Sequence, residues 1–523
     1  MILGSIYVTA GAIIVGVPIG LLTAIYMSRF ASPRINKVLL PAVQLLAGIP
    51  SVVYGFFGMI VMVPAVQAMV KSDFFKTVLH VKSGKGMSLF TAGLLLGIMI
   101  LPTIITVSKT SLDAVPQSYY EGSLALGATH ERSVFSAVLP AAKSGVMSGV
   151  VLGVGRAIGE TMAVIMIAGN QAIMPSGLLK GLRTMTANIV LEMGYASGLH
   201  REALIATGVV LFVFILIINL CFSAVKRKAD ATCKKRNVRT ERRAARAARA
   251  YRRHPMSLVQ RIAVTASAVI TFAILAALLA YILIMGVPNL KPSLFAWHYT
   301  SDNCSMTPAI INTLLMVVLS LLLSVPFGIG AAIYLVEYAK RGNKLVKVVR
   351  LTAETLSGIP SIVYGLFGML FFVTKLHWGY SMIAGAFTLA IMVLPVIMRT
   401  TEEALIAVPD SYREGSFGLG AGKLRTVFTI VLPSAMPGIL SGVILATGRI
   451  VGETAALIYT ASSVAKIPSG VFSSTRTLAV HMYLLSNEGL YIGQTYGTAV
   501  VLLVLVLVIN GLSGLVAGKL AKR

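Results

Sequence analysis

The fold of this chain is decided by two stretches, Gly155-Arg-Ala-Ile-Gly-Glu-Thr161 and Gly448-Arg-Ile-Val-Gly-Glu-Thr454, because each lies inside a long apolar segment. Both place an arginine and a glutamate four residues apart, near the middle of a predicted membrane helix. A charge at that depth costs roughly 2.5–3.5 kcal/mol on insertion scales, so it needs a partner, a water-filled cavity or a function. The two copies predict a pair of half-sites that face one pathway.

The composition indicates an all-α polytopic membrane protein. Of the 523 residues, 56% are hydrophobic and 12% are charged, and apolar runs long enough to cross a ~30 Å hydrocarbon core recur along the chain. The formal net charge is +27, with 13 of the 45 Lys and Arg between Lys226 and Arg253. In a membrane protein such a cluster marks a cytoplasmic segment, so we expect no nucleic-acid partner. The three cysteines have no metal-ligand spacing, so no metal site is predicted.

Three further motifs occur twice and in the same order, which predicts a duplicated chain. The matching pairs are Ala47–Met59 with Ser357–Met369, Val115–Ser123 with Val408–Ser416, and Pro175–Gly177 and Arg183 with Pro468–Gly470 and Arg476. We therefore predict a first half at residues 1–225, a basic cytoplasmic linker at 226–256 and a second half at 257–523. The arginine stripe of the linker predicts either a tether beside anionic lipid head groups or a binding site for a protein or RNA.

About 11 membrane spans are predicted, at residues 2–28, 38–66, 89–108, 144–168, 203–225, 258–286, 309–337, 348–374, 381–399, 435–460 and 497–519. The most basic loops then all fall on one side, which the positive-inside rule makes cytoplasmic. The leading span of the second half, near 258–286, has no counterpart in the first. We expect a mis-assigned start at Met1 rather than the loss of a helix.

Two predicted cytoplasmic loops share the pattern Glu-Gly-Ser-x-x-Leu-Gly-Ala, at Glu121–Ala128 and Glu414–Ala421. The pattern predicts a short helix, a glycine break and a second helix that enters the membrane. Its apolar residues have no lipid to face, so we expect them to dock on another protein; an ordinary polar connection is the alternative. The residues expected to carry this coupling are Glu121, Gly122, Gly127, Glu414, Gly415 and Gly420.

These loops resemble the EAA-type coupling loop of ABC-importer permeases. Together with Gly-Ile-Pro-Ser-x-Val-Tyr-Gly and Gly-Arg-x-x-Gly-Glu-Thr, they resemble the two permease subunits of the phosphate-specific (Pst) importer, fused as a first-subunit-like half followed by a second-subunit-like half. The resemblance implies two type I ABC-importer permease halves, a multi-pass location in a bacterial-type cell membrane, two copies of an ATPase subunit and an external phosphate-binding protein.

The resemblance also implies a transporter without catalytic residues. ATP and Mg²⁺ would be bound by the partner ATPase, and this chain itself would bind no cofactor. The nearest match to a phosphate-binding loop, Gly418–Leu424, lacks the first glycine at the right offset and has leucine where Ser or Thr must bind magnesium.

The candidate substrate-binding residues are Arg156, Glu160, Arg449 and Glu453. Arginine presents a planar fork of donors that matches a tetrahedral oxyanion and stays charged. The glutamates would hold the empty site near neutral and could accept the proton of phosphate, which favours phosphate over sulfate. The Pst resemblance points to the same positions as important for transport. The alternative is a structural Arg–Glu lock between spans.

Gly48-Ile-Pro-Ser51 and Gly358-Ile-Pro-Ser361 predict that a span breaks near mid-membrane, because proline lacks a donor and disfavours helix for its predecessor. The exposed helix-end amides would suit an anion. Ser51 and Ser361 could cap the restarted helix or touch the substrate, whereas the alternative is a packing kink. Arg183 and Arg476 are weaker candidates for an anion entrance or a contact with the binding protein.

The sequence thus predicts the permease of an ATP-driven importer of inorganic phosphate. The nearer alternative is the same machine for another oxyanion, molybdate or sulfate. The more distant one is a secondary transporter or channel that needs no ATPase, against which the two coupling loops argue.

Overall fold

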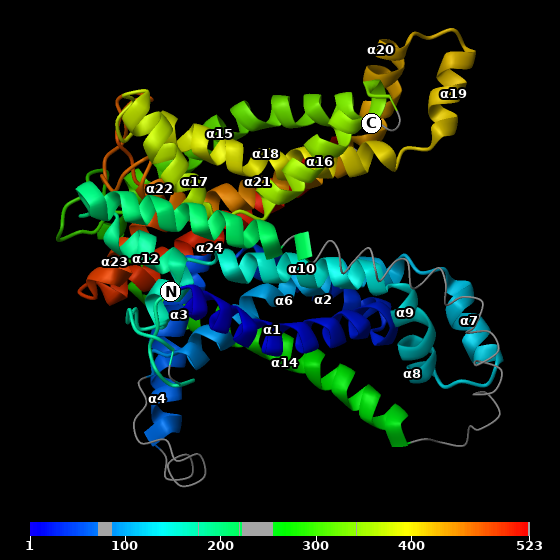
Figure 1. Ribbon diagram of the computed structural model, residues 1–523, viewed down its shortest axis with the longest axis horizontal. Helices are drawn as coiled ribbons and strands as arrows, with labels where there is room; N and C mark the ends of the chain where they lie inside the picture. Colours follow the sequence, from blue (N-terminus) through cyan, green and yellow to red (C-terminus); the bar gives the residue numbers. More distant parts are fainter. Residues whose placement is uncertain (72–85, 176, 219, 222–254, 341–342, 521–523) are drawn as a thin grey trace. The chain divides into compact units, whose positions relative to one another are not determined.

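The computed structural model describes residues 1–71, 86–175, 177–218, 220–221, 255–340 and 343–520 (Figure 1). The predicted linker at 226–256 lies outside them except for its last two residues. The described residues are mostly helical, with one isolated bridge between Gly169 and Leu182. Nine described helices are long and apolar enough to cross a membrane, or up to eleven if each of two bent helix pairs is one span. The all-α membrane fold predicted from the sequence is confirmed.

Two of the predicted spans are broken at their prolines. The stretch predicted as one span at 38–66 is two helices, because α2 (Pro33–Gly48) ends just before Ile49-Pro50 and α3 begins at Ser51. The candidate crossing helix there is Ser51–Lys71. The second break separates Val346–Ser357 from Ser361–Lys375, which differ in direction by 102°. Both breaks fall at the prolines, as predicted.

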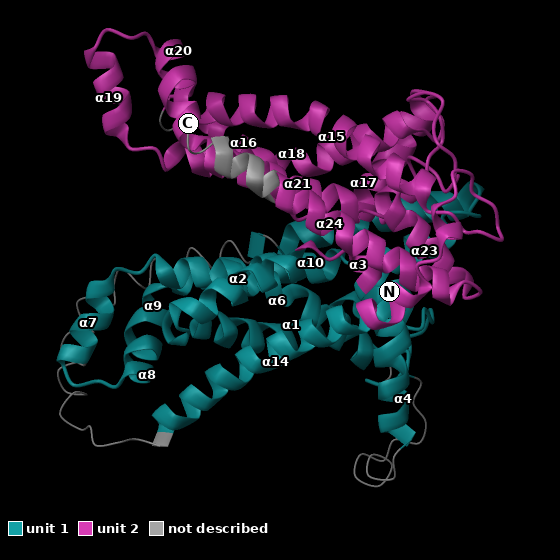
Figure 2. Ribbon diagram, turned by 180° about the vertical axis from the view of Figure 1, so that it is seen from behind, with its two compact units in different colours: residues 1–47, 54–281 teal, residues 48–53, 282–523 magenta. Residues whose placement is uncertain are grey.

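The helices form two compact units (Figure 2). Unit 1 comprises residues 1–47 and 54–281. Its elements, besides α2, are α1 (Ile2–Ile25), η1 (Tyr26–Phe30), the part of α3 (Ser51–Phe57) that follows residue 53, η2 (Gly58–Met62), α4 (Val63–Lys71), α6 (Leu89–Asp113), α7 (Gln117–Ala125), α8 (His130–Ser133), η3 (Val134–Val138), α9 (Leu139–Ala141), α10 (Lys143–Gly159), α11 (Met162–Ile167), α12 (Met185–Glu192), the helix Gly198–Ile218 and most of α14 (Pro255–Gly286). Small residues bring α1 and α6 together: a Cβ on Gly11 would lie 3.3 Å from the Cα of Gly93.

Unit 2 comprises residues 48–53 and 282–523 and repeats the order of unit 1. Its elements are η4 (Val287–Asn289), η5 (Pro292–Phe295), α15 (Thr307–Ile333), η6 (Tyr334–Tyr338), α16 (Lys344–Ser357), α17 (Ser361–Gly368), η7 (Met369–Lys375), α18 (Met382–Ile406), α19 (Asp410–Gly418), α20 (Lys423–Thr426), η8 (Val427–Val431), α21 (Leu432–Gly452), α22 (Ala455–Ile458), α23 (Leu478–Glu488) and α24 (Ile492–Leu520). The π-helical turns η1 and η6 follow α1 and α15 at matching places, which supports the internal repeat.

The compact units do not coincide with the predicted halves. The leading span of the second half, α14, contributes Val264 to a core cluster of unit 1. The hydroxyls of Thr23 and Thr271 lie 3.0 Å apart within that unit. Conversely, residues 48–53 of the first half belong to unit 2. Each half therefore lends a segment to the unit formed mainly by the other, and the division at 225 and 257 stays a prediction about the repeat.

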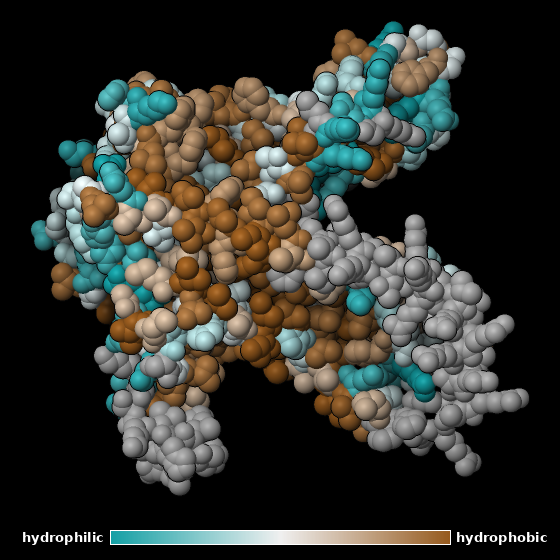
Figure 3. Space-filling view, in the orientation of Figure 1, coloured by the Kyte–Doolittle hydropathy of each residue, from teal (hydrophilic) through white to brown (hydrophobic). Residues whose placement is uncertain are grey.

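Within each unit, the helices of the two predicted coupling loops lie at one end, α7 and α8 in unit 1 and α19 and α20 in unit 2 (Figure 1). Apolar side chains cover the middle of the helices, and polar ones gather toward the ends (Figure 3). Large apolar residues of α14 and α15, such as Val269 at 61% and Phe327 at 70%, are exposed. Such surfaces suit contact with lipid rather than water.

Candidate functional site

The motif Gly-Arg-x-x-Gly-Glu-Thr, which occurs in both halves of the chain, forms a helix break in unit 1. Helix α10 ends at Gly159, Glu160 is extended (φ −69°, ψ 130°), and α11 begins at Met162. Arg156 lies in the last turn of α10. The prediction that Arg156 and Glu160 share the middle of one continuous helix is therefore wrong, because the glutamate has already left the helix.

Unit 2 repeats this break. Helix α21 ends at Gly452 with Arg449 in its last turn, Glu453 is extended (φ −76°, ψ 131°), and α22 begins at Ala455. Glu453 is 9% exposed, whereas Arg449 is half-buried. The same local structure in both units shows that the motif encodes a break rather than a helix interior.

Each glutamate side chain caps the helix that restarts after the break. Oε1 of Glu160 accepts hydrogen bonds from the backbone N–H groups of Thr161 (3.1 Å) and Ala163 (3.3 Å). Oε1 of Glu453 accepts one from Ala456 (3.1 Å). A carboxylate in this position satisfies orphan donors and interacts favourably with the positive end of the helix. Each unit thus fixes a carboxylate one residue beyond the helix that carries the arginine.

The two arginines have different neighbours. Nη1 of Arg156 donates a hydrogen bond to Oγ1 of Thr103 on α6, 3.3 Å away. At the repeat offset of 293 residues, the position of Thr103 corresponds to Val396, whose side chain offers no acceptor. Unit 1 therefore holds its arginine by a side-chain hydroxyl that unit 2 lacks.

A tyrosine that the sequence interpretation missed stabilises each proline break. The hydroxyl of Tyr54 donates to the carbonyl oxygen of Leu46 (2.8 Å), and that of Tyr364 donates to the carbonyl oxygen of Leu356 (2.7 Å). These carbonyls lie in the last turns of α2 and α16, and the residue four positions on, Pro50 or Pro360, has no N–H to donate. The Leu356 oxygen also accepts from the N–H of Ile359 (3.1 Å). The signal was present in the sequence, since the tyrosine is part of both copies of the motif.

The glycine after each tyrosine brings the two motifs of a unit together. A Cβ on Gly55 would lie 2.9 Å from the Cα of Ala163 on α11, and a Cβ on Gly365 would lie 2.9 Å from the Cα of Ala456 on α22. Only glycine allows this approach. The helix that restarts after the proline break therefore packs on the helix capped by the glutamate.

Ser51 and Ser361 are the first residues of α3 and α17. The N-cap position of α17 is occupied by Pro360, without a side-chain cap, so Ser361 does not cap the restarted helix. Contact of the serines with substrate stays a prediction.

The proline break of the first half packs within unit 2. A Cβ on Gly452 would lie 3.5 Å from the Cα of Pro50, and a Cβ on Gly48 would lie 3.3 Å from Nδ2 of Asn510 on α24. The break preceding Ser51 therefore lies beside the end of α21, next to Glu453. Ser51, Arg449 and Glu453 thus all belong to unit 2, whereas their contact with one substrate and the pairing of Arg449 with Arg156 stay predictions.

Both coupling loops have the predicted helix–glycine–helix form. In unit 1, α7 is followed by Gly127 (φ +84°) and α8; in unit 2, α19 is followed by Gly420 (φ +80°) and α20. These φ values favour glycine. Glu121, Gly122, Glu414 and Gly415 are all exposed. So are the apolar side chains of the loops, including Leu126 (50%) and Leu419 (90%).

The coupling helix of unit 2 is anchored by Arg413. Its Nη2 donates to Oε1 of Glu337 (2.7 Å) and to the carbonyl oxygen of Leu405 (2.9 Å), and its Nη1 donates to that of Val408 (2.8 Å). Unit 1 uses other residues for the same purpose.

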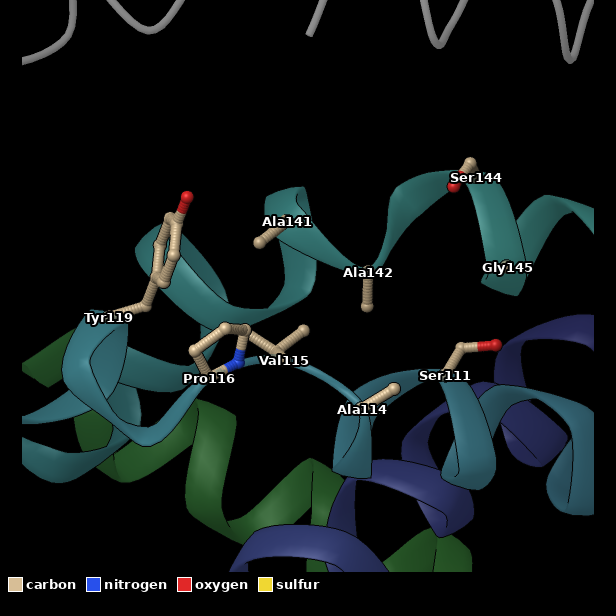
Figure 4. Close-up of a pocket in the computed structure, with 9 residues that line it drawn as sticks. All are labelled: Ser111, Ala114, Val115, Pro116, Tyr119, Ala141, Ala142, Ser144 and Gly145. Atoms are coloured by element: carbon tan, nitrogen blue, oxygen red, sulfur yellow. The ribbon is translucent and has the colours of Figure 1, made fainter. Parts of the chain in front are cut away.

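In unit 1, Nη2 of Arg29 donates to the carbonyl oxygen of Leu112 (2.8 Å), the residue that corresponds to Leu405. Within the coupling loop itself, the hydroxyl of Tyr120 lies 2.5 Å from Nδ1 of His130. A pocket of about 390 Å³ lies between the end of α6, the start of α7 and the junction of α9 with α10 (Figure 4). It is lined by Ser111, Ala114, Val115, Pro116, Tyr119, Ala141, Ala142, Ser144 and Gly145. The coupling helix of unit 2 is therefore tied to the membrane helices by Arg413, and in unit 1 the His130 ring of α8 packs edge-on against Phe30 of η1, with ring centroids 4.5 Å apart.

Comparison with known proteins finds one transport-protein family in both halves of the chain. A family model described as "Binding-protein-dependent transport system inner membrane component" matches residues 16–231 and 324–522. The "Probable ABC transporter permease protein YqgI" of Bacillus subtilis is 36% identical over 264 residues, which cover 46% of this chain and 88% of that protein. The "Phosphate transport system permease protein PstA homolog" of Mycoplasma pneumoniae is 26% identical and covers 98% of this chain and 85% of its own length. The "Phosphate transport system permease protein PstC" of Pasteurella multocida is 34% identical over 42% of this chain and 70% of its own.

Proposed function

The chain belongs to the family of inner membrane components of binding-protein-dependent transport systems, and from this premise we propose that it is the permease of an ATP-driven importer of inorganic phosphate. It is a multi-pass protein of the bacterial plasma membrane and contains both permease halves in one chain. The observation that carries the proposal is the pair of breaks after Arg156 and Arg449, each with a carboxylate fixed immediately beyond the helix end.

The chemistry of these breaks suits hydrogen phosphate. Arg156 and Arg449 would bind the oxyanion through their donor forks. Glu160 and Glu453, held by the amides of α11 and α22, would offset the arginine charges in the empty site. A carboxylate can also accept the O–H of hydrogen phosphate, and sulfate has no such proton at neutral pH. The relatives named as phosphate transport permeases support this cargo.

The proline breaks would supply further donors. The amides at the start of α3 and α17 carry partial positive charge, and Ser51 and Ser361 stand at those positions. Tyr54 and Tyr364 would keep the breaks rigid by satisfying the preceding helix ends. We assign Ser51 and Ser361 to substrate contact and the tyrosines to positioning.

The coupling loops would dock on a separate ATPase. Exposed apolar residues on α7 and α19, at the ends of otherwise polar loops, support this role. We propose two ATPase copies, one for each loop, which bind the ATP and Mg²⁺. An external phosphate-binding protein would deliver the cargo at the opposite face. Movement of α19 would reach the membrane helices through Arg413 and Glu337.

The test is uptake of labelled phosphate into vesicles that contain this chain with the ATPase and the binding protein. Uptake should require ATP and resist excess sulfate and molybdate. Competition by one of these anions would keep the importer but change its cargo. Uptake without the ATPase would instead support a secondary transporter.

A further inference from the structure

Buried polar groups without partners gather at the N-terminus of α23 in unit 2. Arg476 is 6% exposed and His481 is fully buried. Among the residues that the structure describes, neither Nε nor Nη2 of Arg476 has a hydrogen-bond partner, nor do Nδ1 and Nε2 of His481 or the hydroxyls of Thr475 and Thr477. Leaving buried polar atoms unpaired is expensive and calls for a physical reason.

Arg476 and His481 both pack against the ring of Tyr299. The guanidinium carbon of Arg476 lies 4.6 Å from the Tyr299 ring centroid, and the His481 ring packs edge-on at 6.0 Å. Burial, followed by the nearby charge of Arg476, lowers the pKa of His481 to about 3. The backbone of Cys304 lies near the ring but not in hydrogen-bond geometry. The imidazole is therefore neutral and offers one donor and one acceptor.

The backbone around this cluster is held firmly. Nδ2 of Asn312 donates to the carbonyl oxygen of Arg476 (3.2 Å), and Oγ1 of Thr313 accepts from the N–H of Leu478 (2.8 Å). Thr477 is the N-cap residue of α23, but its side chain makes no capping hydrogen bond. The unpaired side chains therefore lie on backbone that is fixed by hydrogen bonds. They stand at the positive end of an 11-residue helix.

In unit 1 the corresponding arginine, Arg183, is paired with a carboxylate of the same unit. Arg183, which corresponds to Arg476, donates from Nε to the carbonyl oxygen of Asn170 (2.9 Å) and from Nη1 to Oε1 of Glu192 (2.5 Å). Hydrogen bonds from Tyr195 and then Arg183 hold the pKa of Glu192 below its usual value. Thr184, which corresponds to Thr477, caps α12 by accepting from Ala187.

In unit 2 the carboxylate is missing from the sequence. At the offset of 293 residues, Glu192 corresponds to Leu485 and Asn188 corresponds to His481. Leu485 is 1% exposed and cannot pair with a guanidinium. The position that Glu192 fills in unit 1 therefore holds no carboxylate in unit 2, although the arginine is retained. Burial lowers the pKa of Arg476 and the charge of Glu488, the last residue of α23, opposes that shift, but Glu488 forms no ion pair with Arg476 among the described residues.

We propose that Arg476, His481 and the N-terminus of α23 form a binding site for a hydrogen phosphate ion. Arg476 and the helix amides would bind its charged oxygens, and the acceptor nitrogen of neutral His481 would take its O–H. Sulfate lacks that O–H and would bind less well. The helix α23 lies at the end of unit 2 opposite α19 and α20 (Figure 1), which the loop charges predict to be external. If the proposed function holds, on which this role rests, the site would receive phosphate before the ion reaches Arg449.

The experiment is equilibrium dialysis of the purified full-length chain with radiolabelled inorganic phosphate, without ATPase or binding protein. The starting variant carries Arg156→Gln and Arg449→Gln, so that binding reports on the α23 site. We expect one phosphate per chain, and at least tenfold weaker binding when Arg476→Gln is added. An excess of sulfate should displace little phosphate.

A second variant keeps Arg476, His481 and the amides of α23 unchanged. Leu485→Glu supplies the carboxylate that unit 1 has, and it should abolish phosphate binding, whereas the uncharged control Leu485→Gln should retain it. Circular dichroism and gel filtration identify any variant that fails to fold. The proposal is overturned if the starting variant binds no phosphate, or if neither Arg476→Gln nor Leu485→Glu weakens binding. If the unsubstituted chain, with its ATPase and binding protein, shows no ATP-dependent phosphate uptake while the dialysis binding is intact, the proposed import function is contradicted and this site is left standing.

Discussion

Oε1 of Glu453 accepts a hydrogen bond from the backbone N–H of Ala456, 3.1 Å away, and so fixes a carboxylate one residue beyond the helix that carries Arg449. Unit 1 repeats this relationship between Glu160 and Ala163. The glutamate therefore has two separable properties: its hydrogen bond stabilises the break, and in the proposed site its charge would offset the arginine.

Glu453→Gln and Glu453→Ala separate these properties. Glutamine keeps an acceptor for Ala456, so the free energy of unfolding should change little while phosphate uptake falls with the lost charge. Alanine removes the cap and should destabilise the chain by about 1 kcal/mol as well. Thermal unfolding of both purified variants, with uptake assayed in parallel, checks this. Equal stability of the two would show that the capping bond does not contribute.

Removing the hydroxyl of Tyr364 should destabilise unit 2. Tyr364→Phe removes one of two hydrogen bonds to the carbonyl oxygen of Leu356, which also accepts from the N–H of Ile359 (3.1 Å), at a net cost of about 0.5–1.5 kcal/mol. The matched control is Tyr412→Phe, because Tyr412 is 51% exposed and its hydroxyl can be replaced by water. Chemical denaturation in detergent measures both, and an equal effect of the two substitutions would contradict the role given to Tyr364.

Arg413→Met should loosen the coupling helix α19. It removes hydrogen bonds from a charged group to Glu337, Leu405 and Val408, each worth roughly 1.5–3 kcal/mol. We expect reduced stability and weaker stimulation of ATP hydrolysis by the binding protein. Arg399→Met is the control, since its pair with Glu403 is exposed and is worth about 0.3–0.5 kcal/mol.

Leu419→Ser should weaken binding of the ATPase without affecting the fold. Leu419 is 90% exposed on the coupling loop, so its replacement removes little packing within the chain. The control Leu490→Ser changes a residue that is 80% exposed and lies between α23 and α24. Co-purification with the ATPase should fall for the first variant only; an equal loss for both would place the docking surface elsewhere.

The sequence predicted much of the fold because its signals were local. Proline marked the breaks before Ser51 and Ser361, and glycine marked the turns at Gly127 and Gly420. The break after Gly159 was missed, since arginine and glutamate four residues apart also fit one face of a continuous helix. A glutamate that caps a restarted helix cannot be told from an ion-paired one by spacing alone.

Long-range packing explains the other differences. No local pattern could show that α14 packs in unit 1 or that residues 48–53 pack in unit 2, because both depend on contacts between distant segments. The contrast between Arg183 and Arg476 was accessible, since aligning the halves places Glu192 opposite Leu485. Its meaning required the structure, which shows one guanidinium paired with a carboxylate and the other buried without one.

The central claim is that phosphate crosses through the arginine half-sites. The direct measurement is ATP-dependent uptake of labelled phosphate into vesicles containing the chain, its ATPase and its binding protein, with Arg156→Gln and Arg449→Gln tested separately. Loss of a hydrogen-bonded charge costs about 1.5–3 kcal/mol, so each variant should lower uptake roughly ten- to a hundredfold while the assembly still forms. Wild-type uptake in both variants would contradict the account.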